Sequence, residues 1–155
     1  MIEMAKENAK NVLRMDRDKL KREEKRTIGA VHEIERLLGI RGLDRMEAFD
    51  ISNISGFQTV ASMVVFEKGK ARRQDYRKFR LKTIEGPDDY ASMEEVLTRR
   101  FLHGKKELED LQKEGKDENL GSFTKFPNLI LMDGGKGQVN VAERVLSRLN
   151  LQIPV

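Results

Sequence analysis

The chain has 155 residues, 36% of them charged and 38% hydrophobic, with a formal net charge of +4, so it suits one domain with a real core. It contains no cysteine, which excludes a disulfide framework and a thiolate metal site. No apolar run approaches the roughly 18 residues of a membrane span, and the N-terminus lacks the apolar core of a signal peptide, so we expect a cytoplasmic protein without a membrane partner.

The first 42 residues are expected to form a helical lead-in. Five apolar residues recur there at helical spacing, namely Ile2, Ala5, Ala9, Val12 and Leu13. A second helix is predicted over Thr27–Leu38, and Gly39 is expected to end it. We therefore predict a lead-in segment over residues 1–42 and a main domain over residues 43–155.

The next part of the chain has the alternating pattern of strands. Strands are predicted over Arg45–Ser52, Thr59–Phe66 and Asp75–Lys82, with turns around Gly56 and Gly69. Because the connections are short, these strands are expected to form an antiparallel meander.

A basic stretch overlaps the third predicted strand. Between residues 67 and 82 there are eight Lys or Arg against two acids, with Tyr76 and Phe79 interleaved. This composition is typical of a surface that binds a phosphate backbone, but taken alone it is explained slightly better by a solvated, charged edge strand. By position alone, the candidates for a DNA track are Arg72, Arg73 and Arg77.

The second half of the chain alternates helix, strand and helix. Its predicted elements are a helix over Tyr90–His103 that the charged Lys105–Lys116 can extend, a loop over Asp117–Lys125, a strand over Asn128–Met132 and a helix over Val139–Leu149. The strand is apolar throughout, which predicts burial on both faces.

This order of elements predicts an α/β, ribonuclease-H-like mixed sheet, an antiparallel meander plus parallel strands, with flanking helices. In such a sheet the first strand and the strand after the first domain helix lie side by side and parallel. Asp50 and Asp133 stand near the ends of these two strands, where open α/β sheets gather their ligands. Two carboxylates that meet there repel each other unless a cation lies between them, so a metal site is expected.

The string DGGKGQ, residues 133–138, is the sharpest motif. Glycines permit a close backbone approach to a phosphate, and Gly134, Gly135 and Lys136 are the candidates to hold one at the helix start. The motif is not a P-loop, because the GxxxxGK[ST] spacing fails, which argues against a nucleotide-binding phosphotransferase. A tight strand-to-helix turn is the simpler alternative.

Each acidic candidate also has a structural explanation. Asp50 alone suits the cap of a turn, and Asp88 and Asp89 suit the N-cap and first turn of a helix as well as a metal role. The two histidines, His32 and His103, have no ligand spacing to a partner, so both are assigned to structure or solvent.

Several strings in order resemble the C-terminal endonuclease domain of UvrC, the incising subunit of bacterial nucleotide excision repair. They are EAFDISN (47–53), GFQTVASMVVF (56–66), YRKF (76–79), GPDDYASM (86–93) and LMDGGKGQ (131–138). The match runs from about Arg45 to Val145, and residues 105–126 match weakly and read as a variable insertion.

The resemblance implies Mg²⁺ or Mn²⁺ and hydrolysis of a phosphodiester 5′ to a lesion in damaged double-stranded DNA, beside a UvrB-type partner and with no small-molecule substrate. It implies catalytic roles for Asp50, Asp133 and Asp89. The family's third core residue is a histidine well beyond DGGKGQ, so this chain is expected to stop before it and to be poorly active or inactive alone. We do not transfer that role to His32 or His103.

The hypothesis is therefore metal-assisted DNA hydrolysis. Asp50 and Asp133 would hold the metal, and Asn53 and Gln138 would orient ligands or water. A catalytically inactive nucleic-acid- or protein-binding module of the same fold is the alternative, and metal affinity at the two acids separates them.

Overall fold

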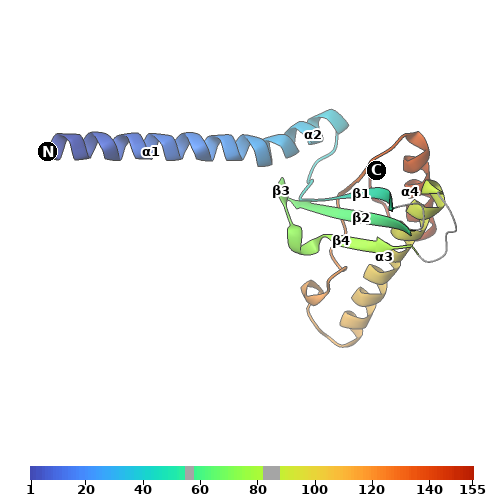
Figure 1. The fold of residues 1–155 in the computed structure, drawn as a ribbon. Coiled ribbons are helices and arrows are strands. Elements are labelled where there is room, and N and C mark those ends of the chain that lie inside the picture. The colour runs from blue at the N-terminus through green and yellow to red at the C-terminus, as the bar shows by residue number, and fades with distance from the viewer. Residues whose placement is uncertain (55–57, 82–87) are drawn as a thin grey trace. The chain divides into compact units, whose positions relative to one another are not determined.

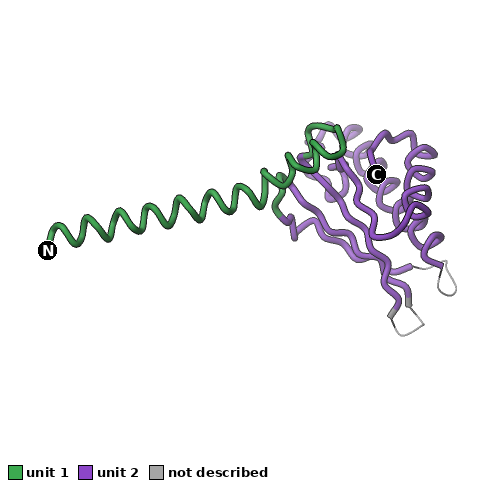
Figure 2. The backbone as a smooth tube through the Cα atoms, turned by 90° about the horizontal axis from the view of Figure 1, so that it is seen from above, with its two compact units in different colours: residues 1–43, 68–70 green, residues 44–67, 71–155 purple. Residues whose placement is uncertain are grey.

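The structure, a computed structural model, describes residues 1–54, 58–81 and 88–155. It divides into two compact units, one of residues 1–43 with 68–70 and one of residues 44–67 with 71–155 (Figure 2). Within these described ranges, no helix combines the length and the apolar character needed to cross a membrane.

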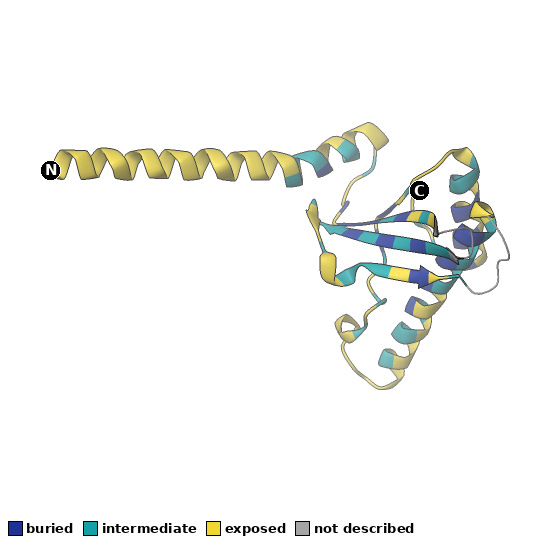
Figure 3. Ribbon diagram, in the orientation of Figure 1, coloured by how far each residue is buried: buried dark blue, intermediate teal, exposed yellow. Residues whose placement is uncertain are grey.

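The first unit is helical. Helix α1 (Ile2–Glu24) continues through a π-helical turn (Lys25–Gly29) into α2 (Ala30–Leu38), so the two predicted helices are joined without a break (Figure 1). No residue of α1 is buried (Figure 3). Helix α2 ends as predicted at Gly39, which adopts a φ of 66°.

A carboxylate secures the chain after α2. Glu35 accepts hydrogen bonds from the backbone N–H groups of Gly42 at 2.8 Å and Leu43 at 3.0 Å. The bond from Leu43 above all, with that from Gly42, holds the pKa of Glu35 below its ordinary value, although burial opposes this.

The second unit contains the predicted mixed sheet. Its strands are β1 (Arg45–Ile54), β2 (Gln58–Glu67), β3 (Lys70–Ala71), β4 (Arg77–Arg80) and β5 (Leu129–Met132). The order is β3-β2-β1-β5, and β4 also pairs with β2. β1 is antiparallel to β2 and parallel to β5, which confirms the predicted neighbours.

The third predicted strand is shorter than expected. β4 begins only at Arg77, because β3 and a 3₁₀ turn (Arg73–Asp75) come first. Asp75 is held in this turn by Nη1 of Arg45, at 2.7 Å. The predicted turn around Gly56 and the end of the predicted strand at Lys82 lie outside the described residues.

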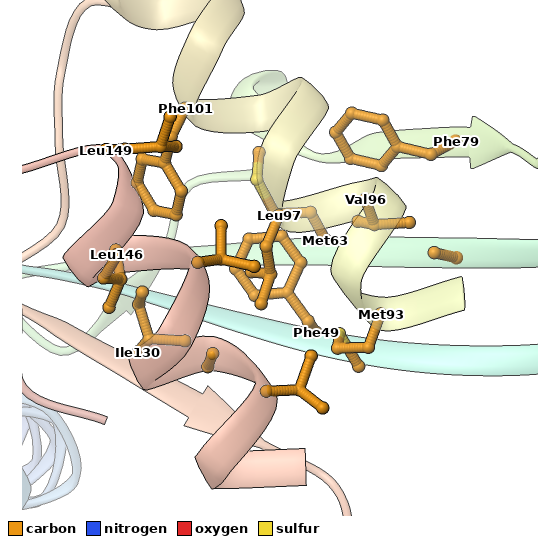
Figure 4. Packing of buried hydrophobic residues seen from close by; sticks show 14 of the residues in the cluster. Phe49, Met63, Phe79, Met93, Val96, Leu97, Phe101, Ile130, Leu146 and Leu149 are labelled. Carbon is orange, nitrogen blue, oxygen red and sulfur yellow. The ribbon is translucent and has the colours of Figure 1, made fainter. Parts of the chain in front are cut away.

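Two helices pack against one face of the sheet. They are α3 (Asp89–Lys113), which runs on through the charged segment that the sequence left open, and α4 (Lys136–Arg148), which starts three residues before its predicted beginning. The shared hydrophobic cluster joins strands and helices (Figure 4); it includes Phe49, Met63, Phe79, Met93, Val96, Leu97, Phe101, Ile130, Leu146 and Leu149.

The opposite face of β5 corrects one expectation. Leu129 and Ile130 point to opposite faces and both are buried, but Leu131 is 38% exposed, so the predicted burial on both faces holds only for the first half of the strand. Successive side chains of a strand point to opposite faces, and Leu131 points away from the cluster that Ile130 joins.

The C-terminal segment was not assigned from the sequence. Leu151, Ile153 and Val155 are packed against the cluster, while Gln152 and Pro154 are exposed. The backbone N–H of Ile130 donates to the carbonyl of Pro154 at 2.9 Å. This alternation and this bond lay the segment along β5.

A buried ion pair connects β1, α3 and the loop before β5. Arg100 donates to both carboxylate oxygens of Glu47, at 3.0 and 2.8 Å, and to the carbonyls of Phe123 and Lys125. Arg45 also binds Glu47; burial opposes its charge, but its bond to Asp75 and the two neighbouring acids raise its pKa. The segment that the sequence left as a variable insertion is therefore anchored at its end.

Candidate metal centre

Asp50 and Asp133 come together where β5 ends beside the middle of β1, because β1 continues four residues beyond Asp50 instead of ending near it as predicted. Phe49 of β1 is paired with Met132 of β5 in the parallel ladder, and each is followed by an aspartate. The backbone N–H of Asp133 donates to the carbonyl of Phe49 at 3.4 Å. Both aspartates are exposed and line one hollow of about 430 Å³.

This hollow lies on the sheet face away from the helices. Phe49 points into the hydrophobic cluster, so its neighbour Asp50 points to the other face, where it is paired with Ser62 of β2. Ala48, Ser62, Val64 and Leu131 also line the hollow. Asp50 accepts one hydrogen bond there, from Ser52 at 3.3 Å.

The DGGKGQ segment forms a tight strand-to-helix turn beside Asp133. Gly134 has a φ of 155°, and a Cβ atom there would lie 2.7 Å from Cγ of Gln138, so this position requires glycine. Gly135 is the N-cap residue, and the exposed Lys136 is the first residue of α4. The backbone N–H of Gln138 donates to the carbonyl of Gly135 at 3.0 Å.

The two acids at the start of α3 have different positions. Asp88 is the N-cap residue, and its carboxylate accepts a hydrogen bond from the N–H of Ala91 at 3.0 Å. Asp89 is exposed and makes no hydrogen bond or ion pair with the described residues. Asp88 therefore caps the helix, and among the described residues nothing occupies the carboxylate of Asp89, which could bind a ligand.

The start of α3 lies against the start of α4. A Cβ atom at Gly137 would lie 2.5 Å from Oη of Tyr90, so the backbone and the ring are in close approach. This contact brings the end of the GPDDY string next to the DGGKGQ turn, whereas Gly86 and Pro87 lie outside the described residues.

The donor set suits a hard divalent cation. Carboxylate oxygens are the ligands that Mg²⁺ and Mn²⁺ prefer, and Mg²⁺ is commonly held by one or two carboxylates while water and phosphate oxygens complete its shell. Among the described residues no group of three or more His, Cys, Asp and Glu is arranged to hold a metal. Asp50 and Asp133 therefore fit an open, two-carboxylate site.

Residues 35–155 match the family described as the UvrC RNase H endonuclease domain. The chain belongs to this family. Over its whole length it is 55% identical to a UvrABC system protein C of Lachnospira eligens and 49% identical to one of Clostridium beijerinckii. It spans about a quarter of the length of these relatives, 24% and 25% respectively.

Membership of the UvrC family agrees with the ribonuclease-H-like sheet predicted from the order of elements. The roles of individual residues stay predictions. Asn53 is exposed on β1, and its Oδ1 accepts from Thr59 at 2.7 Å. Because it lies three residues beyond Asp50 on a regularly paired strand, it points to the opposite sheet face and not into the hollow. Oε1 of Gln138 is buried without a hydrogen-bond partner among the described residues.

The three arginines predicted for a DNA track are not brought to Asp50. Arg77 is paired with Met63, whose side chain is in the cluster, and its guanidinium lies 5.2 Å from the ring centroid of Phe123. Arg72 lies 3.6 Å from Glu67, at the far end of β2, and Arg73 is exposed in the 3₁₀ turn.

Two other cations of this UvrC-family sheet share the face of Asp50, and the sequence analysis did not single them out. Lys78 and Arg80 are exposed on β4 on either side of the buried Phe79. The alternation around Phe79 was visible in the sequence, but the strand pairing that relates it to Asp50 was not. Neither histidine lines the hollow at Asp50 and Asp133. Both are exposed, and the ring of His103 packs on that of Phe123.

Proposed function

We propose that this chain is the metal-dependent DNA endonuclease domain of a UvrC-like excinuclease subunit. Its reaction is hydrolysis of a phosphodiester 5′ to a lesion in double-stranded DNA, together with a UvrB-type partner. The observation that carries the proposal is the convergence of Asp50 and Asp133 in one hollow, where β5 ends beside its parallel neighbour β1. The description of the family and the names of the relatives support it.

Two residues of the hollow and several residues outside its lining would share the chemistry. Asp50 and Asp133 would hold Mg²⁺ or Mn²⁺, whose chemistry there would be to activate water and to offset negative charge on the phosphate. Lys136 and the backbone at Gly134 and Gly135 hold a phosphate oxygen at the N-terminus of α4. Gln138 orients ligands or water, and Asp89 serves as an additional acid from α3.

The alternative is an inactive binding module of the same fold. The observation that favours it is the two-carboxylate site: no third acid or histidine among the described residues joins Asp50 and Asp133. Such a module presents the sheet to DNA or to a protein without holding a divalent ion.

Manganese binding separates the two candidates. Titration of the chain with Mn²⁺, followed by the electron paramagnetic resonance of the free ion, is expected to show weak saturable binding. The variants Asp50→Asn and Asp133→Asn each lose it, because each removes a charged ligand. Asp44→Asn is the matched control, since Asp44 is an exposed aspartate just before β1.

Two results would count against the proposal. Binding that is absent in the wild-type chain, or unchanged in both site variants, favours the inactive module. A full-length UvrC-type protein that carries the change at Asp50 and still nicks lesion-containing DNA at the normal rate removes the catalytic role.

A further inference from the structure

Lys78 and Arg80 share the sheet face of the two aspartates. Phe79 lies between them on β4 and points into the hydrophobic cluster, so its two neighbours point to the opposite face. On β2, Met63 belongs to the cluster, and the adjacent Ser62 points to the same opposite face as Asp50. The cations and the hollow are therefore on one surface.

The strand register places these groups in a row. Asp50 is directly opposite Ser62 on β2, and Ser62 is directly opposite Lys78 on β4. Arg80 is opposite Val60, one pleat further along the same face. Because neighbouring strands lie about 4.8 Å apart, Lys78 is about 10 Å from Asp50 across the sheet, a distance spanned by a few nucleotides of one strand.

Neither cation is used by the part of the fold that the structure describes. The side chains of Lys78 and Arg80 form no hydrogen bond or ion pair with the described residues, and both are exposed. In contrast, Nη1 of Arg77 donates to two backbone carbonyls, those of Gln74 and Tyr76, and Arg72 is 3.6 Å from Glu67. An exposed, unpaired Lys–Arg pair has its full charge available for an anionic ligand.

We propose that Lys78 and Arg80 bind backbone phosphates of the DNA strand that enters the hollow at Asp50 and Asp133. This inference rests on the proposed function and names the path of its substrate. The strand crosses β4, β2 and β1 in turn, and the Ser62 hydroxyl lies between the cations and the carboxylates. Without a divalent ion the carboxylates repel phosphate, so binding of the strand across β4 and β2 depends on Lys78 and Arg80.

Salt-dependent DNA binding tests this path. The affinity of the chain for a fluorescent DNA duplex is measured by anisotropy, without divalent ions, over a range of salt concentrations. The double variant Lys78→Ala/Arg80→Ala is expected to bind roughly tenfold more weakly at low salt. The slope of log affinity against log salt falls by about two units, because two phosphate contacts are lost.

The matched control is Arg72→Ala/Arg73→Ala, which removes the same charge from the same basic segment but away from the row. It is expected to keep the wild-type slope. The inference is overturned if the Lys78/Arg80 variant keeps the wild-type affinity and slope, if the control loses as much, or if the wild-type chain shows no salt-dependent binding.

Cross-linking gives a second measurement of position. The chain contains no cysteine, so Lys78→Cys and Arg73→Cys each accept a thiol-reactive photo-cross-linker at one site. The label at position 78 is expected to attach to DNA, and the label at position 73 is not; the reverse pattern contradicts the inference. Mn²⁺ binding is unchanged in the Lys78/Arg80 variant, so failure of this inference and failure of the metal site are distinguishable.

Discussion

Glu47 and Arg100 form an ion pair whose side chains are 0% and 1% exposed. A charge taken out of water is costly, so each partner depends on the other. Arg100 also lies over the rings of Phe101, Phe123 and Phe126, at 5.1, 5.5 and 5.6 Å from their centroids. Arg100 also donates to the carbonyls of Phe123 and Lys125, so the pair fixes the loop before β5, the strand that Asp133 follows.

Breaking this pair from one side is expected to destabilise the sheet unit severely. Glu47→Gln leaves the buried guanidinium without its counter-charge, and a loss of about 3–5 kcal/mol in the free energy of unfolding is expected. Urea unfolding followed by circular dichroism measures it. The double change Glu47→Leu/Arg100→Met should recover part of the loss, because no unpaired charge remains. A loss under about 1 kcal/mol in Glu47→Gln would contradict this account.

At the residue scale the sequence pointed to Asp50 and Asp133, although Asp50 lies inside β1 and does not end it, and the sequence missed the buried Glu47 of the same strand. Asp50 and Asp133 were recognised because each comes where an apolar run ends. Glu47 shares the strand parity of the buried Phe49, which was a sign of burial, but its partner lies 53 residues away on α3. A pairing over such a distance depends on the packing of α3 against β1, and no local pattern contains it.

The turn between β5 and α4 holds Asp133 at the mouth of the hollow. Gly134 and Gly135 are adjacent in it, but only Gly134 has a positive φ, and only its Cβ would meet another side chain. Gly135 has a φ of −88° and open space around the position of a Cβ. Glycine is therefore needed at position 134 but not at position 135, a difference that the sequence motif does not show.

An alanine at each glycine separates these requirements. Gly134→Ala is expected to cost about 1–3 kcal/mol of unfolding free energy, because the backbone conformation is strained for an L side chain and Gln138 is crowded. Gly135→Ala is expected to cost less than about 1 kcal/mol, the penalty of a weaker N-cap. Urea unfolding of both variants measures the difference. Equal losses would show that the turn rearranges.

At the element scale the sequence predicted which elements exist better than where they end. β4 starts late because the ion pair of Asp75 with Arg45 fixes a 3₁₀ turn where a strand was expected. α4 starts early: its first turn already contains Lys136 and Gly137, and Gly137 lies against the ring of Tyr90. Both boundaries depend on contacts that the local pattern does not contain.

At the scale of the whole molecule, the residues of the hydrophobic core are spread unevenly along the chain. Every member of the main cluster, together with the partly buried residues packed on it, lies between Phe49 and Val155. α1, in contrast, buries none of its residues. The predicted mixed sheet could be inferred because its strands have distinct apolar patterns. The boundary between residues 42 and 43 stays a prediction that truncation can test.

Two truncations are expected to have opposite effects on the sheet unit. Residues 43–155 alone should unfold cooperatively, within about 1 kcal/mol of the full chain, since the cluster is complete. Removing only residues 151–155 should cost roughly 2–4 kcal/mol, because Leu151, Ile153 and Val155 leave the cluster and Ile130 loses the carbonyl of Pro154. Urea unfolding followed by tyrosine fluorescence reports on this unit, since Tyr76 and Tyr90 both belong to it. If the long N-terminal deletion proves the more costly, the domain boundary is wrong and the lead-in is part of the fold.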